Sequence, residues 1–256
     1  MSDGAPSVLF EADRGLAILT LNRPERRNGM AGDMLDLLLG HLTRIATDPA
    51  ISVVILRGAG SDFCVGADIK ESPDGVRKQD YRRIAGLYHT STLLHEMPKV
   101  TIAAIDGGCA GAGLGWAGAC DFRFASDRAV FSTAFLKVGV AGDLGTAWSL
   151  VQAVGPARAR ELMFFPEKFG AAEAERIGLV TRVFPAAQLH AETERMAREL
   201  TGRSSLALEM MKRNFLSAER MDIADYIDIE GARHSHVVVS EGAAEGFRAF
   251  IRGSGG

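Results

Sequence analysis

The stretch from Pro98 to Asp121 is the feature that most constrains the fold of this chain. It begins with an apolar run at 100–105, which predicts a buried strand because the run is short and turn residues bound it. A turn at 106–108 ends the strand, and Gly111-Ala112-Gly113 then precedes small residues that predict a buried helix at 114–120. A strand, a glycine turn and a helix start aim free backbone N–H groups at one point. The sequence therefore predicts an oxyanion hole here, where a negative oxygen would be stabilised.

Two other interpretations of this stretch are disfavoured. Its length and weak polarity are compatible with a membrane span, but Asp106 and the glycines that follow favour a core element of a protein in water. The letters from Gly113 to Gly118 match the dinucleotide fingerprint GxGxxG. That motif opens directly after its strand, whereas about eight residues intervene here, so we interpret the match as chance.

Composition limits the class of protein. The chain has 256 residues, of which 47% are hydrophobic, enough for a large core. A net charge of -3 with scattered Lys and Arg gives no electrostatic surface for nucleic acid or an anionic membrane. Cys64, Cys109 and Cys120 lack CxxC spacing, which predicts buried thiols in a reducing compartment. The N-terminus lacks the basic and apolar regions of a signal peptide, so we expect a cytoplasmic protein.

The remaining pattern predicts an α/β fold in which a β-β-α unit occurs twice. The predicted strands are 7–12, 16–21, 52–57, 100–105, 121–125, 129–132 and 179–184. The predicted helices are 34–45, 80–96, 114–120, 146–154, 156–164, 171–177 and almost everything after Pro185. A polar segment at 72–80 is expected to be mobile and to form a lid over a pocket.

The C-terminal part of the chain differs from the rest because it has helices but few strands. We therefore expect a core at 1–195 that carries the site and a helical oligomerisation region at 196–256. This region is rich in large apolar residues: Met210, Phe215, Met221, Tyr226, Ile227, Phe247, Phe250 and Ile251. Two outcomes have equal weight, docking on a neighbouring subunit and packing back onto the chain's own core.

Six pieces of the sequence, in order, resemble the crotonase family, which is also called the enoyl-CoA hydratase/isomerase family. The pieces are 21–24, 62–70, 98–121, 131–154, 178–183 and 245–250. The resemblance covers nearly the whole chain. It implies a crotonase (ClpP-like) spiral of β-β-α repeats with a C-terminal helical trimerisation region. It also implies homotrimers or dimers of trimers and an acyl-CoA substrate, with coenzyme A as part of the substrate and no separate cofactor.

The resemblance also implies a site. It assigns the oxyanion donors to the backbone N–H groups of Ala67 and Ala112, each worth roughly 3 to 4 kcal/mol to a developing oxyanion. It places CoA along Val65, Ala67, Asp68, Ile69 and Lys70, with its phosphates near Lys70 and Arg26 or Arg27. From the residues alone, these basic side chains would be interpreted as solvated surface charges.

The sequence departs from the best-known hydratases of the family at both catalytic glutamates. Those positions match Gly115 and Phe135 here. Water addition needs positioned titratable groups to activate the water and deliver the proton, so ordinary hydratase activity is not expected.

Asp143 is the remaining acidic candidate. Taken alone, it would be interpreted as an N-cap of the following helix. By resemblance, family members that move double bonds place their working acidic residue in this loop. One carboxylate can remove a proton from one carbon and return it to another. Apolar neighbours are expected to raise its pKa: Val140, Leu144, Phe135 and Trp148.

Other functions share the same residues. This loop also resembles that of the 4-chlorobenzoyl-CoA dehalogenases, in which an aspartate at the position of Asp143 is the nucleophile. Those enzymes have a supporting tryptophan where this chain has Phe135, which counts against a dehalogenase. His89 lies near a histidine position of those enzymes, and with Phe135 it is a candidate for the acyl pocket. His234 and His236 lack an acidic or Cys cluster, so we expect no metal site. A hydratase and a non-catalytic acyl-CoA-binding scaffold remain alternatives.

Overall fold

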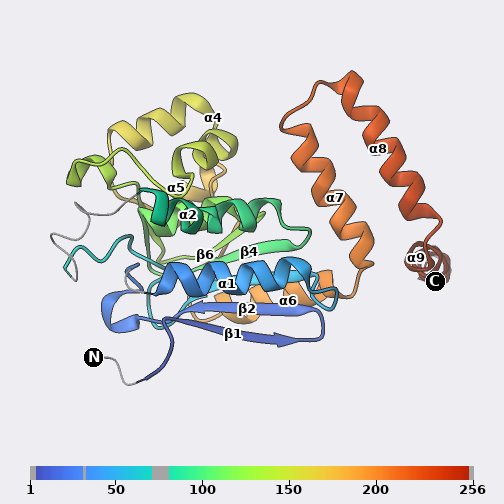
Figure 1. Cartoon of the computed structure of the whole chain (residues 1–256), viewed down its shortest axis with the longest axis horizontal. Helices are drawn as coiled ribbons and strands as arrows, with labels where there is room; N and C mark the ends of the chain where they lie inside the picture. The colour runs from blue at the N-terminus through green and yellow to red at the C-terminus, as the bar shows by residue number, and fades with distance from the viewer. Residues whose placement is uncertain (1–3, 31–32, 71–80, 254–256) are drawn as a thin grey trace.

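A six-stranded sheet forms the centre of the protein (Figure 1). The computed structural model describes residues 4–30, 33–70 and 81–253. The strand order is β1-β2-β3-β4-β6-β9, with β1 and β2 antiparallel and the following pairs parallel. The strands are β1 Val8–Asp13, β2 Leu16–Leu21, β3 Val53–Gly58, β4 Val100–Ile105, β6 Phe122–Ser126 and β9 Arg182–Phe184. A smaller sheet contains β5 Gly108–Ala110, β7 Val130–Ser132 and β8 Phe169–Gly170.

Both faces of the large sheet are covered, which explains why its central strands are continuously apolar. Alternate residues of the central strands β2, β3 and β4 enter two separate cores. One core lies under α1 (Met34–Thr47), α2 (Tyr81–Glu96) and α3 (Ala112–Ala119). The other lies under α6 (Leu189–Thr201). This arrangement confirms the predicted mixed α/β architecture.

The predicted elements agree with the structure with a few exceptions. The helices predicted at 146–154 and 156–164 form one element, α4 (Thr146–Phe164), that is interrupted by Gly155 at φ 75°, ψ 162°. The helix predicted at 171–177 is α5 (Ala171–Arg176). Sequence reasoning missed β5, which begins in the turn predicted at 106–108, as well as β8 and two short 3-10 helices, η1 (Pro24–Arg26) and η3 (Phe135–Val138). The lid expected at 72–80 lies outside the described residues.

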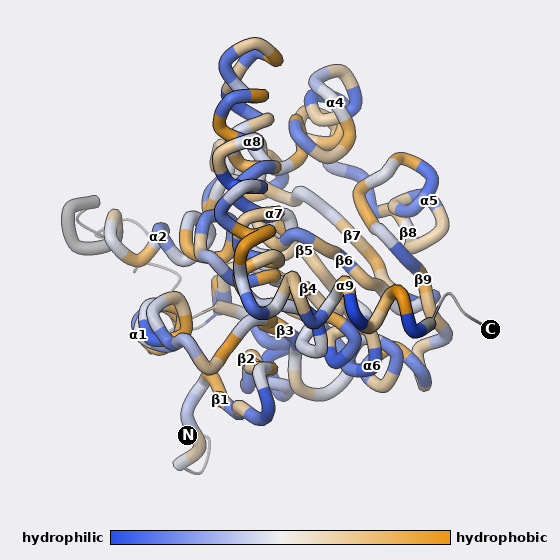
Figure 2. Tube along the Cα trace, turned by 90° about the vertical axis from the view of Figure 1, so that its right-hand side faces the viewer, coloured by the Kyte–Doolittle hydropathy of each residue, from blue (hydrophilic) through white to orange (hydrophobic). Residues whose placement is uncertain are grey.

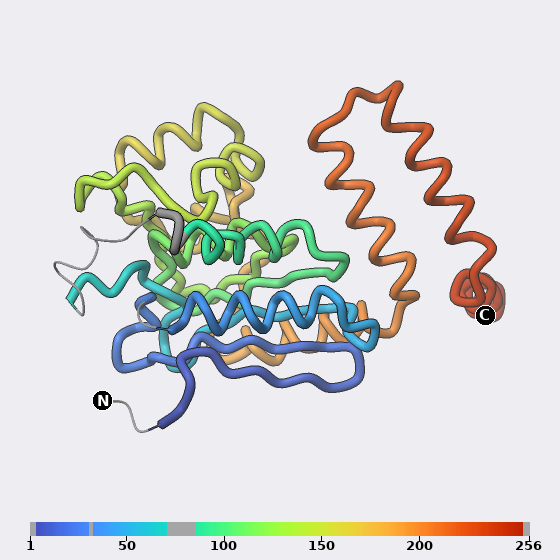
Figure 3. Tube along the Cα trace, in the orientation of Figure 1, coloured from blue at the N-terminus to red at the C-terminus, as the bar shows by residue number. Residues whose placement is uncertain are grey.

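The last three helices extend away from the sheet as an arm (Figures 1 and 3). They are α7 (Ser205–Ala218), α8 (Ile223–Val238) and α9 (Glu241–Gly253). The boundary that we expected between residues 195 and 196 lies inside α6, which packs on the sheet.

A buried lysine anchors this arm. The Lys212 ammonium on α7 donates to Asp121 Oδ2 at 2.9 Å, Lys99 O at 2.8 Å and Leu94 O at 3.2 Å. Lys212 is 5% exposed, so these three acceptors replace water around its charge.

Large apolar side chains on the arm face solvent in the single chain, and Figure 2 shows hydrophobic segments on α8 and α9. Residues with more than half of their surface exposed are Met211, Phe215, Ile223, Ile227, Val239, Phe247, Phe250 and Ile251. The predicted residues Phe215, Ile227, Phe247, Phe250 and Ile251 therefore do not pack back onto the chain's own core. Over the part of the chain that the structure describes, no helix has the length and apolar character needed to cross a membrane.

Candidate active site

Two parallel backbone segments bring Ala67 and Ala112 together. Cys64 pairs with Cys109: Cys64 N donates to Gly108 O at 3.1 Å, and Ala110 N donates to Cys64 O at 2.9 Å. Ala67 lies three residues after Cys64, and Ala112 lies three residues after Cys109. Because the segments run in the same direction, the two alanines lie at the same level.

Glycines allow these two segments to touch. Gly66 has φ +96° and Gly111 has φ +51°, conformations that strain any other residue. A Cβ on Gly66 would be 3.5 Å from Gly111 Cα, and a Cβ on Gly111 would be 3.4 Å from Gly66 Cα. The backbone of one loop therefore lies directly against the backbone of the other.

The N–H groups of Ala67 and Ala112 are both available. Met30 N donates to Gly66 O at 2.8 Å and Asp68 N donates to Met30 O at 2.9 Å, so the Ala67 N–H faces away from Met30. Ala112 begins α3, where N–H groups have no partner within the helix. Within the described residues, neither N–H has a backbone acceptor. This is the arrangement that an oxyanion hole requires.

Asp143 lies in a loop that presses on α3 beyond Ala112. The loop has three residues with positive φ: Gly142 (+122°), Leu144 (+47°) and Gly145 (+76°). The Asp143 carbonyl accepts from Thr146 N at 3.0 Å and from Thr146 Oγ1 at 2.9 Å. Helix α4 begins at Thr146 with Gly145 as N-cap and no side-chain cap. The interpretation of the Asp143 side chain as an N-cap is therefore wrong.

The carboxyl group of Asp143 is partly buried, and one of its oxygens is unpaired. Its Oδ1 has no hydrogen-bond partner among the described residues. Burial raises the pKa of Asp143 from the ordinary 3.8 to about 6. Its charge also helps to raise the pKa of the nearby Cys64 thiol to about 12, although burial is the larger cause. Cys64 therefore stays neutral, and Asp143 has a pKa suited to proton transfer near neutral pH.

The Phe135 ring lies near both Gly111, which precedes the oxyanion donor Ala112, and Gly142, which precedes Asp143. The ring is 3.8 Å from a Cβ position on Gly111 and 4.0 Å from one on Gly142. Phe135 and Leu144 are buried, as expected of apolar neighbours of Asp143. Val140 and Trp148 are each 43% exposed, so these two expected neighbours contribute less to its burial.

Gly115 has no space for a carboxylate side chain. A Cβ at this position would be 2.8 Å from Leu144 Cβ and 2.9 Å from Thr146 Oγ1. The Asp143 loop therefore fills the space that the side chain of a family glutamate would enter. Leu144 and Thr146, which flank this loop, can lie against α3 because Gly115 lacks a side chain.

The residues from Val65 to Lys70, which are expected to hold CoA, differ in how far their side chains are exposed to solvent. Ile69 and Lys70 are exposed and Val65 is half-buried. Asp68 accepts from Arg23 Nη2 at 3.2 Å, and Arg26 Nε lies 3.9 Å from the same carboxylate.

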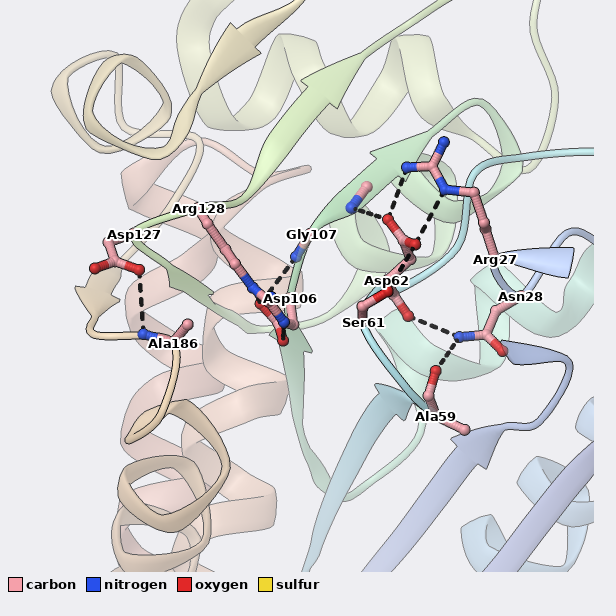
Figure 4. A network of polar contacts seen from close by, with 11 residues as sticks. Arg27, Asn28, Ala59, Ser61, Asp62, Asp106, Gly107, Asp127, Arg128 and Ala186 are labelled. Atoms are coloured by element: carbon pink, nitrogen blue, oxygen red, sulfur yellow. Dashed lines mark hydrogen bonds and ion pairs between the residues drawn. The ribbon is translucent and has the colours of Figure 1, made fainter. Parts of the chain in front are cut away.

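Arg27 and Arg26 differ in availability. Arg27 donates two hydrogen bonds to Asp62, at 3.0 Å and 2.8 Å (Figure 4). These bonds, above all other causes, lower the pKa of Asp62. The Arg26 side chain is 45% exposed and forms only the long contact to Asp68 among the described residues. Arg26 is therefore the better candidate for a phosphate.

Sequence reasoning missed Asn28, which shapes this loop. Asn28 is fully buried at φ +53°, and its amide donates to Asp62 O at 2.7 Å and Ala59 O at 2.9 Å (Figure 4). Its Oδ1 accepts from Arg23 N at 2.8 Å. The only available signal was that asparagine tolerates left-handed backbone.

The histidine candidates are peripheral. His89 is exposed on α2, and its Nδ1 is 3.3 Å from Thr92 Oγ1 on the same helix. His234 and His236 lie on α8, and the described residues contain no group of three metal-ligating side chains.

Comparison with known proteins identifies the family. The family model described as enoyl-CoA hydratase/isomerase matches residues 11–253. The chain belongs to the enoyl-CoA hydratase/isomerase family. It is 32% identical to the Mycobacterium bovis protein named "Probable enoyl-CoA hydratase echA8", covering 96% of this chain and 95% of that one. It is 34% identical to 4-chlorobenzoyl coenzyme A dehalogenase-1 of Arthrobacter, covering 75% and 71%.

Solved structures of the enoyl-CoA hydratase/isomerase family share the fold. The enoyl-CoA hydratase of Bacillus anthracis superposes with a TM-score of 0.91 at 27% identity, over 96% of both chains. A Thermobifida fusca protein solved in complex with CoA gives a TM-score of 0.82 at 29% identity, over 91% and 93%. These likenesses confirm the crotonase fold predicted from the sequence.

Proposed function

We propose that this member of the enoyl-CoA hydratase/isomerase family is an isomerase that moves a C=C bond in an acyl-CoA thioester. The observation that carries the proposal is the partly buried carboxyl of Asp143, whose Oδ1 has no partner among the described residues and whose pKa of about 6 suits both proton removal and proton return. The proposal rests equally on the absence of room for a second carboxylate at Gly115.

The proposed reaction uses one carboxylate and two backbone donors. The thioester oxygen accepts hydrogen bonds from Ala67 N–H and Ala112 N–H. With a β,γ-enoyl thioester, the Asp143 carboxylate removes a proton from the α carbon, and the C–H electron pair is delocalised onto the thioester oxygen to give a dienolate conjugated with the C=C bond. Protonated Asp143 then returns the proton to a different carbon, and the C=C bond is re-formed in its new position. Each N–H stabilises the oxyanion by roughly 3 to 4 kcal/mol.

CoA binding is proposed along Val65 to Lys70, with Arg26 and Lys70 near the phosphates. Both basic side chains are exposed enough to meet an anion. A Thermobifida fusca protein of similar fold was solved in complex with CoA, which supports CoA as part of the ligand of this chain.

A dehalogenase-like hydrolase is the second candidate, favoured by the 34% identity to the Arthrobacter dehalogenase. In that reaction, the Asp143 carboxylate would form a C–O bond to an aromatic carbon and chloride would leave with its bonding electrons. Water would then cleave the resulting ester and release the hydroxylated product and Asp143.

We also propose that the protein assembles as a homotrimer or a dimer of trimers. The exposed apolar residues of α8 and α9 support this proposal, since a second copy would remove them from water. Sedimentation equilibrium tests it, and a monomer at micromolar concentration would contradict it.

Product analysis tests the proposed reaction. Native protein is incubated with β,γ-enoyl, α,β-enoyl and 4-chlorobenzoyl CoA thioesters, and the products are identified by mass. A new double-bond position with an unchanged formula supports the isomerase. Gain of one water indicates a hydratase, chloride release indicates the hydrolase, and CoA binding without turnover indicates a scaffold.

A further inference from the structure

A cavity of about 280 Å³ lies beside the Asp143 loop, on the side away from the oxyanion donors Ala67 and Ala112. Leu144 and Gly145, which follow Asp143 in the chain, form one wall. The other walls come from the second half of α2, the end of α3, the first half of α4 and the two residues that follow α7, Glu219 and Arg220. No residue in these walls donates to the thioester oxygen or transfers a proton in the proposed reaction, although Leu144 and Trp148 are among the apolar neighbours of Asp143.

The cavity is aligned with the oxyanion hole along α3. Ala112, Gly115 and Ala119 follow one another at spacings that place them on one helix face. A rise of 1.5 Å per residue puts Ala119, which lines the cavity, about 10 Å from Ala112. Leu144 packs on Gly115 between the two and also lines the cavity. An acyl chain that starts at Ala112 and follows α3 would therefore enter the cavity if the Leu144 side chain turned aside.

The walls combine apolar surface with one unsatisfied polar group. The Trp148 ring is 43% exposed and is packed edge-on against the His95 ring at 4.8 Å. Ser91 is 8% exposed, and its hydroxyl has no hydrogen-bond partner within the described residues. An unpaired buried hydroxyl is costly, and a bound partner would remove that cost.

The charged groups at the cavity already have partners. His95 Nε2 is 3.1 Å from Glu219 Oε2, and Arg220 Nη2 is 2.5 Å from Glu96 Oε1. A charged ligand would have to compete with these pairs. An uncharged group that donates or accepts a hydrogen bond would instead complete the contacts of Ser91.

We propose that this cavity binds the far end of the acyl group, and that this end carries an uncharged hydrogen-bonding group such as a hydroxyl. The substrate class is thus a medium-length acyl-CoA with a polar, uncharged terminus. This inference rests on the proposed acyl-CoA function and adds the nature of the acyl group.

Fluorescence of Trp148 tests the inference without depending on turnover. The second tryptophan, Trp116, is fully buried and hydrogen-bonded to Thr90, so it serves as a constant background. Full-length native protein is titrated with acetyl-, decanoyl- and ω-hydroxydecanoyl-CoA, and Trp148→Phe is used to assign the signal. We expect a saturable change for both long chains, tighter binding of the hydroxylated one, and no change with acetyl-CoA, whose binding is measured by calorimetry.

The Ser91→Ala variant isolates the polar contact. Loss of one neutral hydrogen bond should weaken binding of ω-hydroxydecanoyl-CoA about three- to tenfold and leave decanoyl- and acetyl-CoA unchanged. Ser235→Ala, on the exposed face of α8, is the matched control. Equal affinity for the two long chains in native protein, or an equal loss for both in Ser91→Ala, would overturn the inference while leaving the proposed function intact. Failure of every CoA thioester to bind would overturn both.

Discussion

Replacing Asp143 with Asn should stabilise the protein at neutral pH while abolishing turnover. The native carboxyl is partly buried, and its Oδ1 has no hydrogen-bond partner among the described residues, so ionisation is unfavourable in the folded state. An amide of the same shape does not ionise and avoids this cost. Stability and activity should therefore change in opposite directions, as expected where a site holds a strained group for function.

The magnitude follows from the pKa of Asp143, which burial raises from 3.8 to about 6. Each pKa unit corresponds to about 1.4 kcal/mol, so the ionised group lowers the free energy of unfolding by up to about 3 kcal/mol. The folded state binds the proton more tightly than the unfolded state. The native protein should therefore lose stability as the pH rises from about 4 to about 6, with no further loss above that window.

Urea unfolding of native protein and Asp143→Asn at one protein concentration measures this effect. The variant should be more stable by up to about 3 kcal/mol near pH 8 and by about 1 kcal/mol near pH 4.5. Asp36→Asn, an exposed position on α1, controls for loss of a charge and should show no such pH dependence. An equal difference at both pH values, or a variant less stable than native at pH 8, would refute the burial argument.

Three further substitutions test other parts of the structure. Gly115→Ala should displace Leu144 and with it the Asp143 loop, so kcat should fall more than KM changes. Gly118→Ala is the matched control, because its Cβ would be 2.7 Å from Ser149 Cβ. Both variants should lower the free energy of unfolding by about 1–3 kcal/mol, but only Gly115→Ala should lower kcat. Lys212→Met should destabilise the chain by about 3 kcal/mol in urea unfolding, because it leaves buried acceptors unpaired; an unchanged midpoint would contradict this. Arg26→Gln should raise the Kd for CoA, measured by calorimetry, about tenfold or more, and the ratio of variant to native Kd should be smaller at high salt. Unchanged affinity would exclude Arg26 from phosphate binding.

Elements with strong local signals could be predicted from the sequence. The apolar run at 100–105 is β4, and the glycine turn after it does open α3 at Ala112. Gly155-Pro156 interrupts α4 where the sequence predicted two helices. In each case, local chemistry determines the conformation, because Pro and Gly restrict or free the backbone regardless of distant contacts.

Features that depend on distant contacts could not be predicted in this way. The sequence gives no sign that Leu144 would pack on Gly115 or that Trp148 would contact His95 on α2. Asp143 has the position of an N-cap but turns its carboxyl inward, because positive φ at Gly142 and Leu144 bends the loop before α4 begins. Its pKa is therefore a property of the folded loop and of the helix face beneath it.

The most direct test of the proposed reaction is proton transfer by Asp143 in deuterated water. Native protein and Asp143→Asn are incubated with a β,γ-unsaturated acyl-CoA, and product formula and deuterium content are read by mass spectrometry. We predict an isomer of unchanged formula that carries solvent deuterium in the native reaction, and neither isomerisation nor exchange in the variant. A product heavier by one water, or isomerisation that continues unchanged in Asp143→Asn, would contradict the role proposed for this carboxyl.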